Sequence, residues 1–272
     1  MSPGALALHG GGEFLPGDEA FLRACLEAAR PAAAARASTG ALPATGAPAW
    51  AGQPAGDDPA ALRIAIVPAA AAGQRPDLAA GHGVEAFARV AAEAGIPVRA
   101  EAVLVVDATS AASGTLAGRL AGADLIHLPG GDPGRLMEIL AGSAAWRAIL
   151  AAVARGAVLA GASAGAMVLA EWTWTPGGWR RGLGLVPGLI VVPHAERVAR
   201  TGWAGTFGGQ VPAAAEPIGR LGLDERSGVL SEVGADGGRR WRVIGTGSVH
   251  WSPNARMPPV HATAGELLLA SA

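Results

Sequence analysis

The sequence predicts an α/β fold with a mostly parallel central sheet and helices on both faces. Short apolar runs alternate with amphipathic stretches along the chain, as in repeated strand–helix–strand units. Several of the apolar runs end directly in glycine-rich turns, where open α/β sheets place their reactive groups. The chain has 272 residues, enough for one large domain or two small ones. Because no repeat period is visible, we expect a single domain over residues 1–272.

The first part of the chain predicts two strands, each followed by a helix. Residues 5–8 form the first strand, which ends in the turn HGGGE at residues 9–13. Asp18 is a candidate N-cap for the helix that follows, because a carboxylate there can accept from the free N–H groups of the first turn. The second strand covers residues 64–67. Its helix starts at Gly83 and stops at Gly95, a residue type that favours a helix C-terminus.

Residues 31–60 interrupt this alternation. They consist mainly of alanine, proline and glycine and show little periodicity. We therefore expect a long, flexible insertion over these residues.

The second part of the chain predicts strands at residues 103–106, 125–128 and 158–160, with a helix over residues 144–155. Beyond residue 171 the sequence turns into short β-like runs among glycines. The tryptophans in this part are expected to pack the second half of the sheet rather than line a pocket.

Composition excludes several classes of function. Half of the residues are hydrophobic and 16% are charged, which excludes wholesale disorder. The net charge of -1 predicts neither a nucleic-acid partner nor an anionic membrane surface. Every basic residue is arginine, so Schiff-base lysines and a P-loop lysine are excluded.

Cysteine content and the length of the apolar runs bear on where in the cell the protein is expected. The single cysteine, Cys25, allows no intrachain disulfide and no cysteine metal cluster. The charge-free stretch at residues 156–170 is too short to span a bilayer, and the N-terminus does not read as a cleaved signal. We expect a soluble cytoplasmic protein.

The strongest local signal is the motif GASAG at residues 161–165, a G-x-S-x-G sequence between a buried strand and the start of a helix. A nucleophilic serine on such a turn has a strained backbone, which tolerates only small neighbours. Ser163 would then point out of the sheet. The N–H of Ala164 would lie at a helix N-terminus, where it can stabilise an oxyanion. The alternative is a small-residue turn that only lets the helix pack closely.

A nucleophilic serine needs a base, and six histidines are available. The candidates are His9, His82, His127, His194, His250 and His261. His127 lies inside an apolar strand and is expected to be a core histidine with satisfied hydrogen bonds. His194 follows an apolar run and Pro193, which places it just past a strand end. We therefore favour His194 as the base, with a surface loop histidine as the alternative.

Acidic residues and glycine turns supply the remaining parts of a site. The acid that orients the base is Glu225 or Asp224, which follow another apolar run. The turn at Gly130 and Gly131 can complete an oxyanion hole opposite the N–H of Ala164, or be an ordinary turn. Glu13, after three glycines, is expected at the same sheet edge. Its turn does not match G-x-G-x-x-G, so no dinucleotide site is predicted.

Taken together, GGGE, LPGGDP, GASAGA, the GLGL at residues 182–185, PHAER and GLDE resemble the cyanophycinase/dipeptidase E family, the S51 serine peptidases. The resemblance covers roughly residues 5–250, outside the segment 31–60. It implies a class I glutamine amidotransferase-like fold, with flavodoxin-like three-layer architecture. It assigns Ser163 as nucleophile, His194 as base and, as in the cyanophycinase branch, Glu225 as acid. In the dipeptidase branch the acid lies between nucleophile and base, where this chain offers only Glu171.

Two departures from cyanophycinases concern the substrate. Those enzymes carry an Asp-Gln pair before the histidine, where this chain has Val192-Pro193, and a glutamine where it has Pro133. The residues of the expected hydrolytic machinery are still present, but a polymer substrate is less strongly indicated.

The resemblance also suggests how a substrate is bound. Arg197 and Arg200 are candidates to bind a substrate carboxylate, with a solvated helix face as the alternative. Glu13 and Asp132 are further candidate substrate-binding residues, and a homodimer is loosely suggested.

The implied chemistry is hydrolysis of α- or β-aspartyl bonds in small peptides through an acyl-enzyme. His194 acts as general base and then general acid, and the N–H groups of Gly131 and Ala164 hold the oxyanion. No metal or organic cofactor is required.

Two other functions are considered. An α/β-hydrolase esterase shares G-x-S-x-G and an HGGG motif, here at residues 9–12, and would use Asp224 or Asp236 with His250. Its position argues against it, because several strands normally precede HGGG in that fold. A family member without catalysis, acting as a binding protein, is the second alternative.

Overall fold

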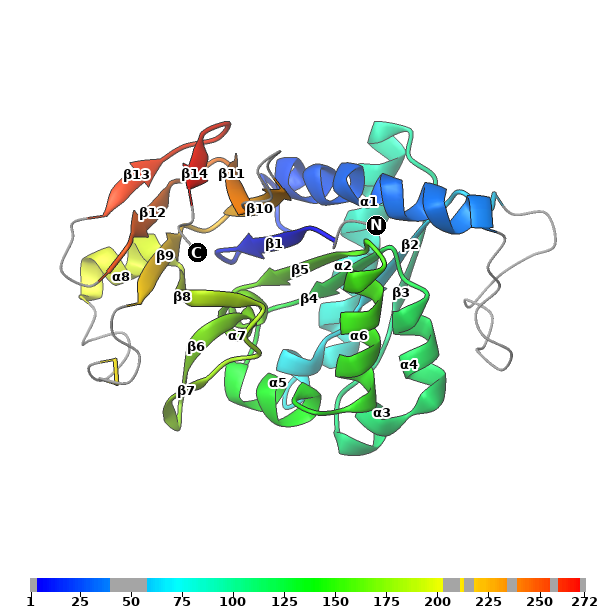
Figure 1. The fold of residues 1–272 in the computed structure, drawn as a ribbon, viewed down its shortest axis with the longest axis horizontal. Coiled ribbons are helices and arrows are strands. Elements are labelled where there is room, and N and C mark those ends of the chain that lie inside the picture. Colours follow the sequence, from blue (N-terminus) through cyan, green and yellow to red (C-terminus); the bar gives the residue numbers. More distant parts are fainter. Residues whose placement is uncertain are drawn as a thin grey trace.

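The structure is a computed structural model that describes residues 4–39, 58–202, 211–212, 218–233, 239–254 and 259–269. Its larger sheet has eight strands in the order β14-β11-β10-β1-β5-β4-β2-β3 (Figure 1). The parallel strands are β1 (Leu6–His9), β2 (Leu62–Ile66), β3 (Val98–Ala102), β4 (Leu125–Leu128) and β5 (Val158–Ala162). The antiparallel strands are β10 (Ser227–Val233), β11 (Arg239–Gly245) and β14 (Leu267–Leu269).

Helices cover both faces of this sheet, which confirms the predicted α/β class. One face packs against α1 (Glu19–Thr39) and α2 (Pro76–Ala94). The other face packs against α4 (Gly114–Ala121), α5 (Pro133–Leu140), α6 (Ala144–Ala154) and α7 (Ala164–Leu169). The short helices η1 (Ala69–Ala71), α3 (Ala108–Ala112) and α8 (Ala195–Thr201) complete the described helices. Because successive residues of a strand point to opposite faces, Ala7 belongs to one apolar cluster and Leu6 and Leu8 to the other.

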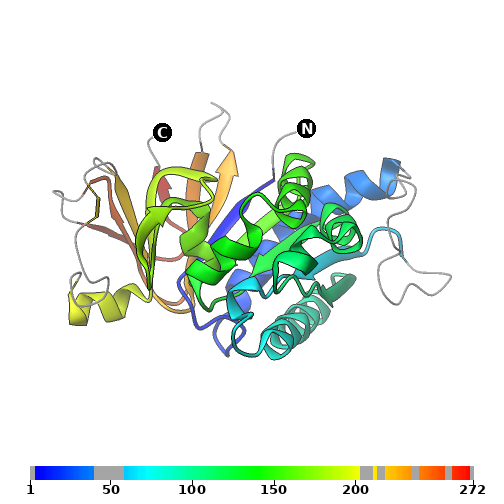
Figure 2. The same cartoon turned by 90° about the horizontal axis from the view of Figure 1, so that it is seen from below.

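A second, six-stranded sheet was not predicted as a separate unit. Its order is β13 (Val260–Ala262), β12 (Val249–Ser252), β9 (Gly219–Leu223), β8 (Val186–Pro193), β6 (Ala170–Thr175), β7 (Gly178–Arg181). Figure 2 shows this sheet beside the α/β layers, with α8 at its outer side. Trp172 is buried with Ile190 and Val192, and Trp174 and Trp179 pack against this cluster. The prediction that these tryptophans pack the sheet is confirmed.

The predicted insertion at residues 31–60 is wrong at its start, because α1 continues through Pro31 to Thr39. Alanine has the highest helix propensity, and Ala32 and Ala33 are buried against the body of the protein. The Arg36 guanidinium lies 2.8 Å from Asp124 Oδ2; the Asp124 side chain is buried and that of Arg36 is 9% exposed. These contacts stabilise a helix in a segment whose composition predicted a flexible insertion. Residues 40–57 of the segment lie outside the described residues.

Two other element boundaries differ from the prediction. The strand expected at residues 103–106 lies earlier, at β3, and Val103 and Val105 are buried in the loop that follows it. Helix α2 starts at Pro76 rather than Gly83 and ends, as predicted, at Gly95 in the left-handed conformation. The buried valines of this loop gave the alternating apolar pattern that is typical of a strand. Pro76 is the first residue of α2, a position that proline favours, whereas the apolar periodicity of the sequence becomes visible only further along the helix.

Within the described residues, no single helix has the length and apolar character needed to cross a membrane. Helices α5 and α6 satisfy that test only as a pair bent by 89°.

Candidate active site

The GASAG segment forms a tight turn between β5 and α7. Ser163 lies at this turn with φ 48° and ψ −112°, a conformation that non-glycine residues rarely adopt. The small neighbours have a direct cause. A Cβ on Gly161 would lie 2.5 Å from the Gly165 carbonyl oxygen, and one on Gly165 would lie 2.1 Å from that of Leu128. The strained serine is therefore held by close backbone packing on both sides, as a nucleophile elbow requires.

His194 follows the last residue of β8 and reaches the serine. Its Nε2 lies 3.1 Å from Ser163 Oγ, and its backbone is in the left-handed region at φ 50°. The His194 N–H donates to the Gly10 carbonyl at 2.9 Å. A Cβ on Gly11 would lie 2.2 Å from His194 Cε1. The glycine turn after β1 thus lies directly against the imidazole.

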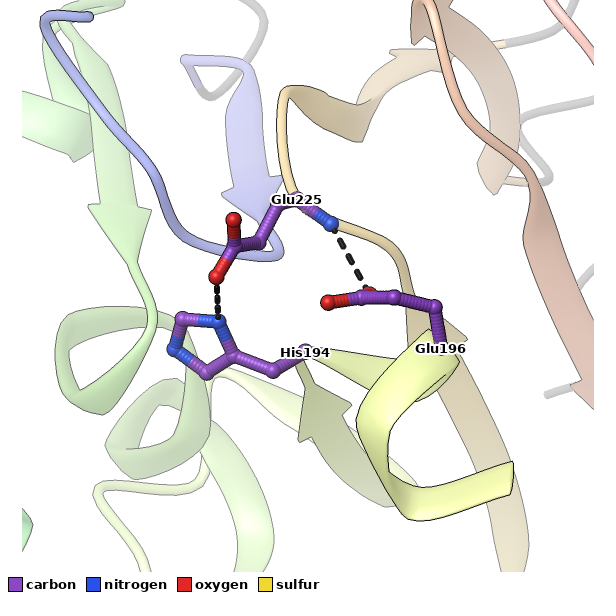
Figure 3. A group of neighbouring side chains, drawn as sticks. All are labelled: His194, Glu196 and Glu225. Atoms are coloured by element: carbon purple, nitrogen blue, oxygen red, sulfur yellow. Dashed lines mark hydrogen bonds and ion pairs between the residues drawn. The ribbon is translucent and has the colours of Figure 1, made fainter. Parts of the chain in front are cut away.

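Glu225 lies in the turn between β9 and β10 and is the third residue of a hydrogen-bonded series with Ser163 and His194. Its Oε1 lies 2.8 Å from His194 Nδ1 (Figure 3). The Glu225 N–H donates to Glu196 Oε2 at 3.2 Å, and Arg197 donates to Glu225 Oε1. Glu196 and Arg197 both belong to the first turn of α8, directly after His194. The same short segment therefore carries His194 and two side chains that contact Glu225.

The neighbouring acid, Asp224, faces a different histidine. Its Oδ1 lies 2.9 Å from His250 Nε2, and its Oδ2 accepts from the Ser248 N–H at 3.0 Å. Of the two acids left open by the sequence, Glu225 is the one beside His194. His250 hydrogen-bonds to Asp224 and His261 rather than to Ser163. Asp236 lies outside the described residues.

The two residues predicted to form an oxyanion hole, Gly131 and Ala164, lie in two turns that meet at Ser163. Ala164 is the first residue of α7, and the first N–H groups of a helix have no partner within it. Gly131 has φ +142°, and a Cβ there would lie 2.4 Å from the Ala70 carbonyl oxygen. A Cβ on Gly130 would lie 3.2 Å from Ser163 Cβ. The glycine turn after β4 and the elbow are therefore in direct contact.

Glu13 and Asp132 both take part in shaping that glycine turn. Glu13 Oε1 accepts from the Gly130 N–H at 2.8 Å. Asp132 is the N-cap of α5, and its Oδ1 accepts from the Gly134 N–H at 2.8 Å. Each carboxylate thus has a structural contact in addition to the substrate contact expected of it.

The two arginines of α8 differ in their surroundings. Arg197 pairs with Glu225 and lies 3.7 Å from Glu196 Oε1. Arg200 is exposed on the same helix. A carboxylate that approaches Arg197 would compete with Glu225.

Two pockets adjoin the glycine turn. One, of about 380 Å³, is lined in part by Glu13, Leu15, His82 and Glu85. The other, of about 210 Å³, is lined in part by Asp132, Arg135, Thr175 and Arg180. Both pockets include charged side chains of either sign, and neither is lined by Ser163 or His194.

His9, at the end of β1, is buried and forms an ion pair. His9 Nε2 is 2.9 Å from Asp18 Oδ1, and His9 Nδ1 accepts from the Gly11 N–H. Asp18, predicted only as an N-cap, uses its other oxygen to accept from the Phe14 N–H at 3.0 Å. This buried pair, which sequence reasoning missed, supports the glycine turn that contacts His194. The HGGG motif predicted a tight glycine turn, but it did not predict that this turn contacts His194.

His127 is buried as predicted, but the prediction that its hydrogen bonds are satisfied is wrong. Neither ring nitrogen has a partner among the described residues. Phe14 and Phe87 pack around the ring. Burial, together with the nearby His9, lowers the pKa of His127 from 6.5 to about 3, so the ring is neutral.

A metal could in principle use the same side chains as the base and acid. His194, Glu196 and Glu225 each offer a ligand atom, all within 4.8 Å of one another. Arg197, however, already pairs with Glu225 there. The positive charge next to that carboxylate makes the group a poor cation site.

The sequence profile of peptidase family S51 matches residues 58–202, just over half of the chain. The chain belongs to peptidase family S51. Family S51 membership supports a peptidase, and thus a hydrolase, and confirms the resemblance seen in the motifs. The α/β-hydrolase alternative is wrong for the same reason.

Solved structures agree with this family at the level of the fold. A peptidase from an acI-B1 Actinobacterium is 23% identical with a TM-score of 0.69, over 98% of this chain and 97% of that chain. A peptidase E-like protein from Listeria monocytogenes EGD-e is 15% identical with a TM-score of 0.50, over 92% of this chain and 98% of that chain. No curated protein matches this S51 chain.

Proposed function

We propose that this S51 family member is a serine peptidase that hydrolyses aspartyl bonds, α or β, in small peptides. The observation that carries the proposal is the unbroken line from Ser163 Oγ through both nitrogens of His194 to Glu225. In such a line the carboxylate fixes the imidazole tautomer, so that Nε2 is free to take the serine proton.

The reaction follows from this geometry. Ser163 Oγ attacks the amide carbonyl carbon while its proton passes to His194 Nε2. The resulting oxyanion is held by the N–H groups of Gly131 and Ala164, and each such donor contributes about 3–4 kcal/mol in comparable sites. The imidazolium then protonates the leaving amine, which gives an acyl-enzyme and the first product. A water, deprotonated by His194, releases the acyl group and restores Ser163.

The aspartyl part of the proposal rests on the family resemblance and on cationic side chains near the site. Arg200 lies on α8, six residues after the base, and Arg135 and Arg180 line the pocket beside Asp132. A guanidinium is a good partner for the substrate carboxylate, because its planar fork matches the two carboxylate oxygens. The missing Asp-Gln pair, replaced by Val192-Pro193, favours short peptides over the cyanophycin polymer.

The test is a mass-spectrometric hydrolysis screen with wild type and Ser163→Ala in parallel. The panel contains α-Asp-X dipeptides, β-Asp-Arg, cyanophycin and a simple ester. We expect cleavage of at least one aspartyl peptide, reduced at least about 10³-fold in Ser163→Ala. Cleavage that survives in Ser163→Ala would contradict the serine mechanism, and cleavage restricted to other peptides would contradict the substrate class.

A matched histidine pair tests the base. His194→Ala should remove activity, whereas His250→Ala should retain it, because His250 contacts Asp224 and not Ser163. If the protein is instead a binding protein without catalytic activity, the wild type should turn over no substrate of the panel.

A further inference from the structure

Two histidines face each other at the outer part of the smaller sheet, away from Ser163. His250 of β12 and His261 of β13 are direct partners in the antiparallel register. Their Nδ1 atoms lie 2.7 Å apart, and their rings are nearly perpendicular at 89°. At most one proton can lie between two nitrogens at this distance, so at least one lone pair points at the other ring. Figure 1 shows the two strands side by side at one end of the molecule.

Asp224 determines which nitrogen of His250 carries its proton. It lies 2.9 Å from His250 Nε2 and is itself held by the Ser248 N–H. A carboxylate in this place keeps the proton on Nε2 and leaves Nδ1 as a lone pair. It also fixes the ring orientation. Metal-ligating histidines characteristically have this arrangement, with a carboxylate on the nitrogen that does not bind the metal.

We propose that His250 and His261 form a binding site for a divalent transition-metal cation, which both would coordinate through Nδ1 while Asp224 holds His250 from behind. His261 is exposed, so water can fill the remaining coordination positions. The site is separate from the proposed peptidase reaction, because neither histidine contacts Ser163, His194 or Glu225 through a hydrogen bond described above.

The metal-free distance between the two Nδ1 atoms can be compared with the ligand separations of different coordination geometries. Two ligands at about 2.0–2.1 Å from a metal are about 2.9 Å apart at a right angle and about 3.3 Å apart in a tetrahedron. The observed 2.7 Å is closer to the right angle. Square-planar or tetragonal geometry with imidazole ligands is preferred by Cu(II) and Ni(II), so these should bind more tightly here than Zn(II).

The experiment is a metal titration of the full-length, chelator-treated protein with Cu(II), Ni(II) and Zn(II), followed by calorimetry and, for Cu(II), electron paramagnetic resonance. We expect one strong site whose Cu(II) spectrum shows two nitrogen ligands. His261→Ala should weaken Cu(II) binding at least about 10-fold, and Asp224→Asn should weaken it about 10- to 100-fold by loss of the carboxylate behind the ligand. Thermal unfolding without metal shows whether each variant is folded.

Two controls separate this site from others. His82→Ala removes an exposed histidine of α2 and should bind Cu(II) as the wild type does. His194→Ala removes a member of the group of three potential ligands formed by His194, Glu196 and Glu225 and should also retain the site. Equal Cu(II) affinity in wild type and His261→Ala, or loss of binding in His194→Ala instead, would overturn the proposal. Because the readout is binding rather than turnover, its result is independent of whether the peptidase reaction is observed.

Discussion

Gly11 lies directly against the imidazole of His194. A Cβ at position 11 would be 2.2 Å from His194 Cε1, and the backbone there has φ +118°, which only glycine adopts readily. The neighbouring Gly10 carbonyl accepts the His194 N–H. The glycine turn after β1 therefore contacts His194 directly, although the two are far apart in the sequence.

Gly11→Ala should consequently displace His194 and lower kcat about 100-fold or more, because small errors in the position of a base are costly. Steady-state kinetics on a peptide identified in the hydrolysis screen, together with thermal unfolding, measure this. Gly114→Ala is the matched control, since a Cβ there meets nothing within 4 Å. Equal kcat in the two variants would mean that the contact does not position the base.

Arg197 donates to the same oxygen of Glu225 that lies against His194 Nδ1. If Arg197 holds the acid, Arg197→Gln should lower kcat about 10-fold with KM nearly unchanged, as expected for loss of one charge-assisted hydrogen bond. Arg197→Lys should restore part of the rate. If Arg197 instead binds the substrate carboxylate, KM rises. Arg200→Gln on the same helix is the comparison, and we expect it to act on KM.

Glu13 accepts a hydrogen bond from the Gly130 N–H in the glycine turn after β4. Glu13→Ala leaves that N–H without its acceptor, so the turn loosens and kcat should fall about 10-fold. Glu13→Gln retains an acceptor oxygen and should stay within about 3-fold of wild type. A charge role toward the substrate makes the opposite prediction, because Glu13→Gln would then raise KM as much as Glu13→Ala. The kcat and KM of both variants separate the two roles.

His127 should make the protein sensitive to acid. Its folded-state pKa is lowered by burial to about 3, below the ordinary value of 6.5. The unfolded chain therefore binds a proton that the folded protein does not between these two pH values. The free energy of unfolding then decreases as pH falls below about 6.5, by about 1.4 kcal/mol per pH unit for this one group. Above that pH the histidine has no such effect.

Urea unfolding of wild type and His127→Leu from pH 8 to pH 5 measures this contribution. The variant should lose about 2 kcal/mol less than the wild type between pH 7 and pH 5. It should stay close to the wild type at pH 7, because it removes two buried ring nitrogens that have no described partner. His82→Leu, at an exposed histidine, should keep the wild-type slope. Parallel slopes for all three proteins would contradict the neutral buried state of His127.

Much of the site could be predicted locally. The alternation of apolar and amphipathic segments predicted β4 at residues 125–128 as it is observed. The small residues around Ser163 predicted the strained turn, since close packing on both sides permits nothing larger. The start of α1 was predicted but not its extent through Pro31. Alanine and proline composition says little about a helix that is held by the distant Asp124.

The α/β class, the turns that end the strands and the positions of Ser163 and His194 on those turns follow from the amino-acid sequence alone, because each depends on periodicity or on residue size over a few positions. Which side chains meet depends on the folded arrangement of distant segments. Asp224 and Glu225 are adjacent in the chain, yet one faces His250 and the other His194, since neighbouring residues of a turn point in different directions. The same holds for Gly11 and His194, whose contact exists only once β1 and β8 have taken their places in two different sheets.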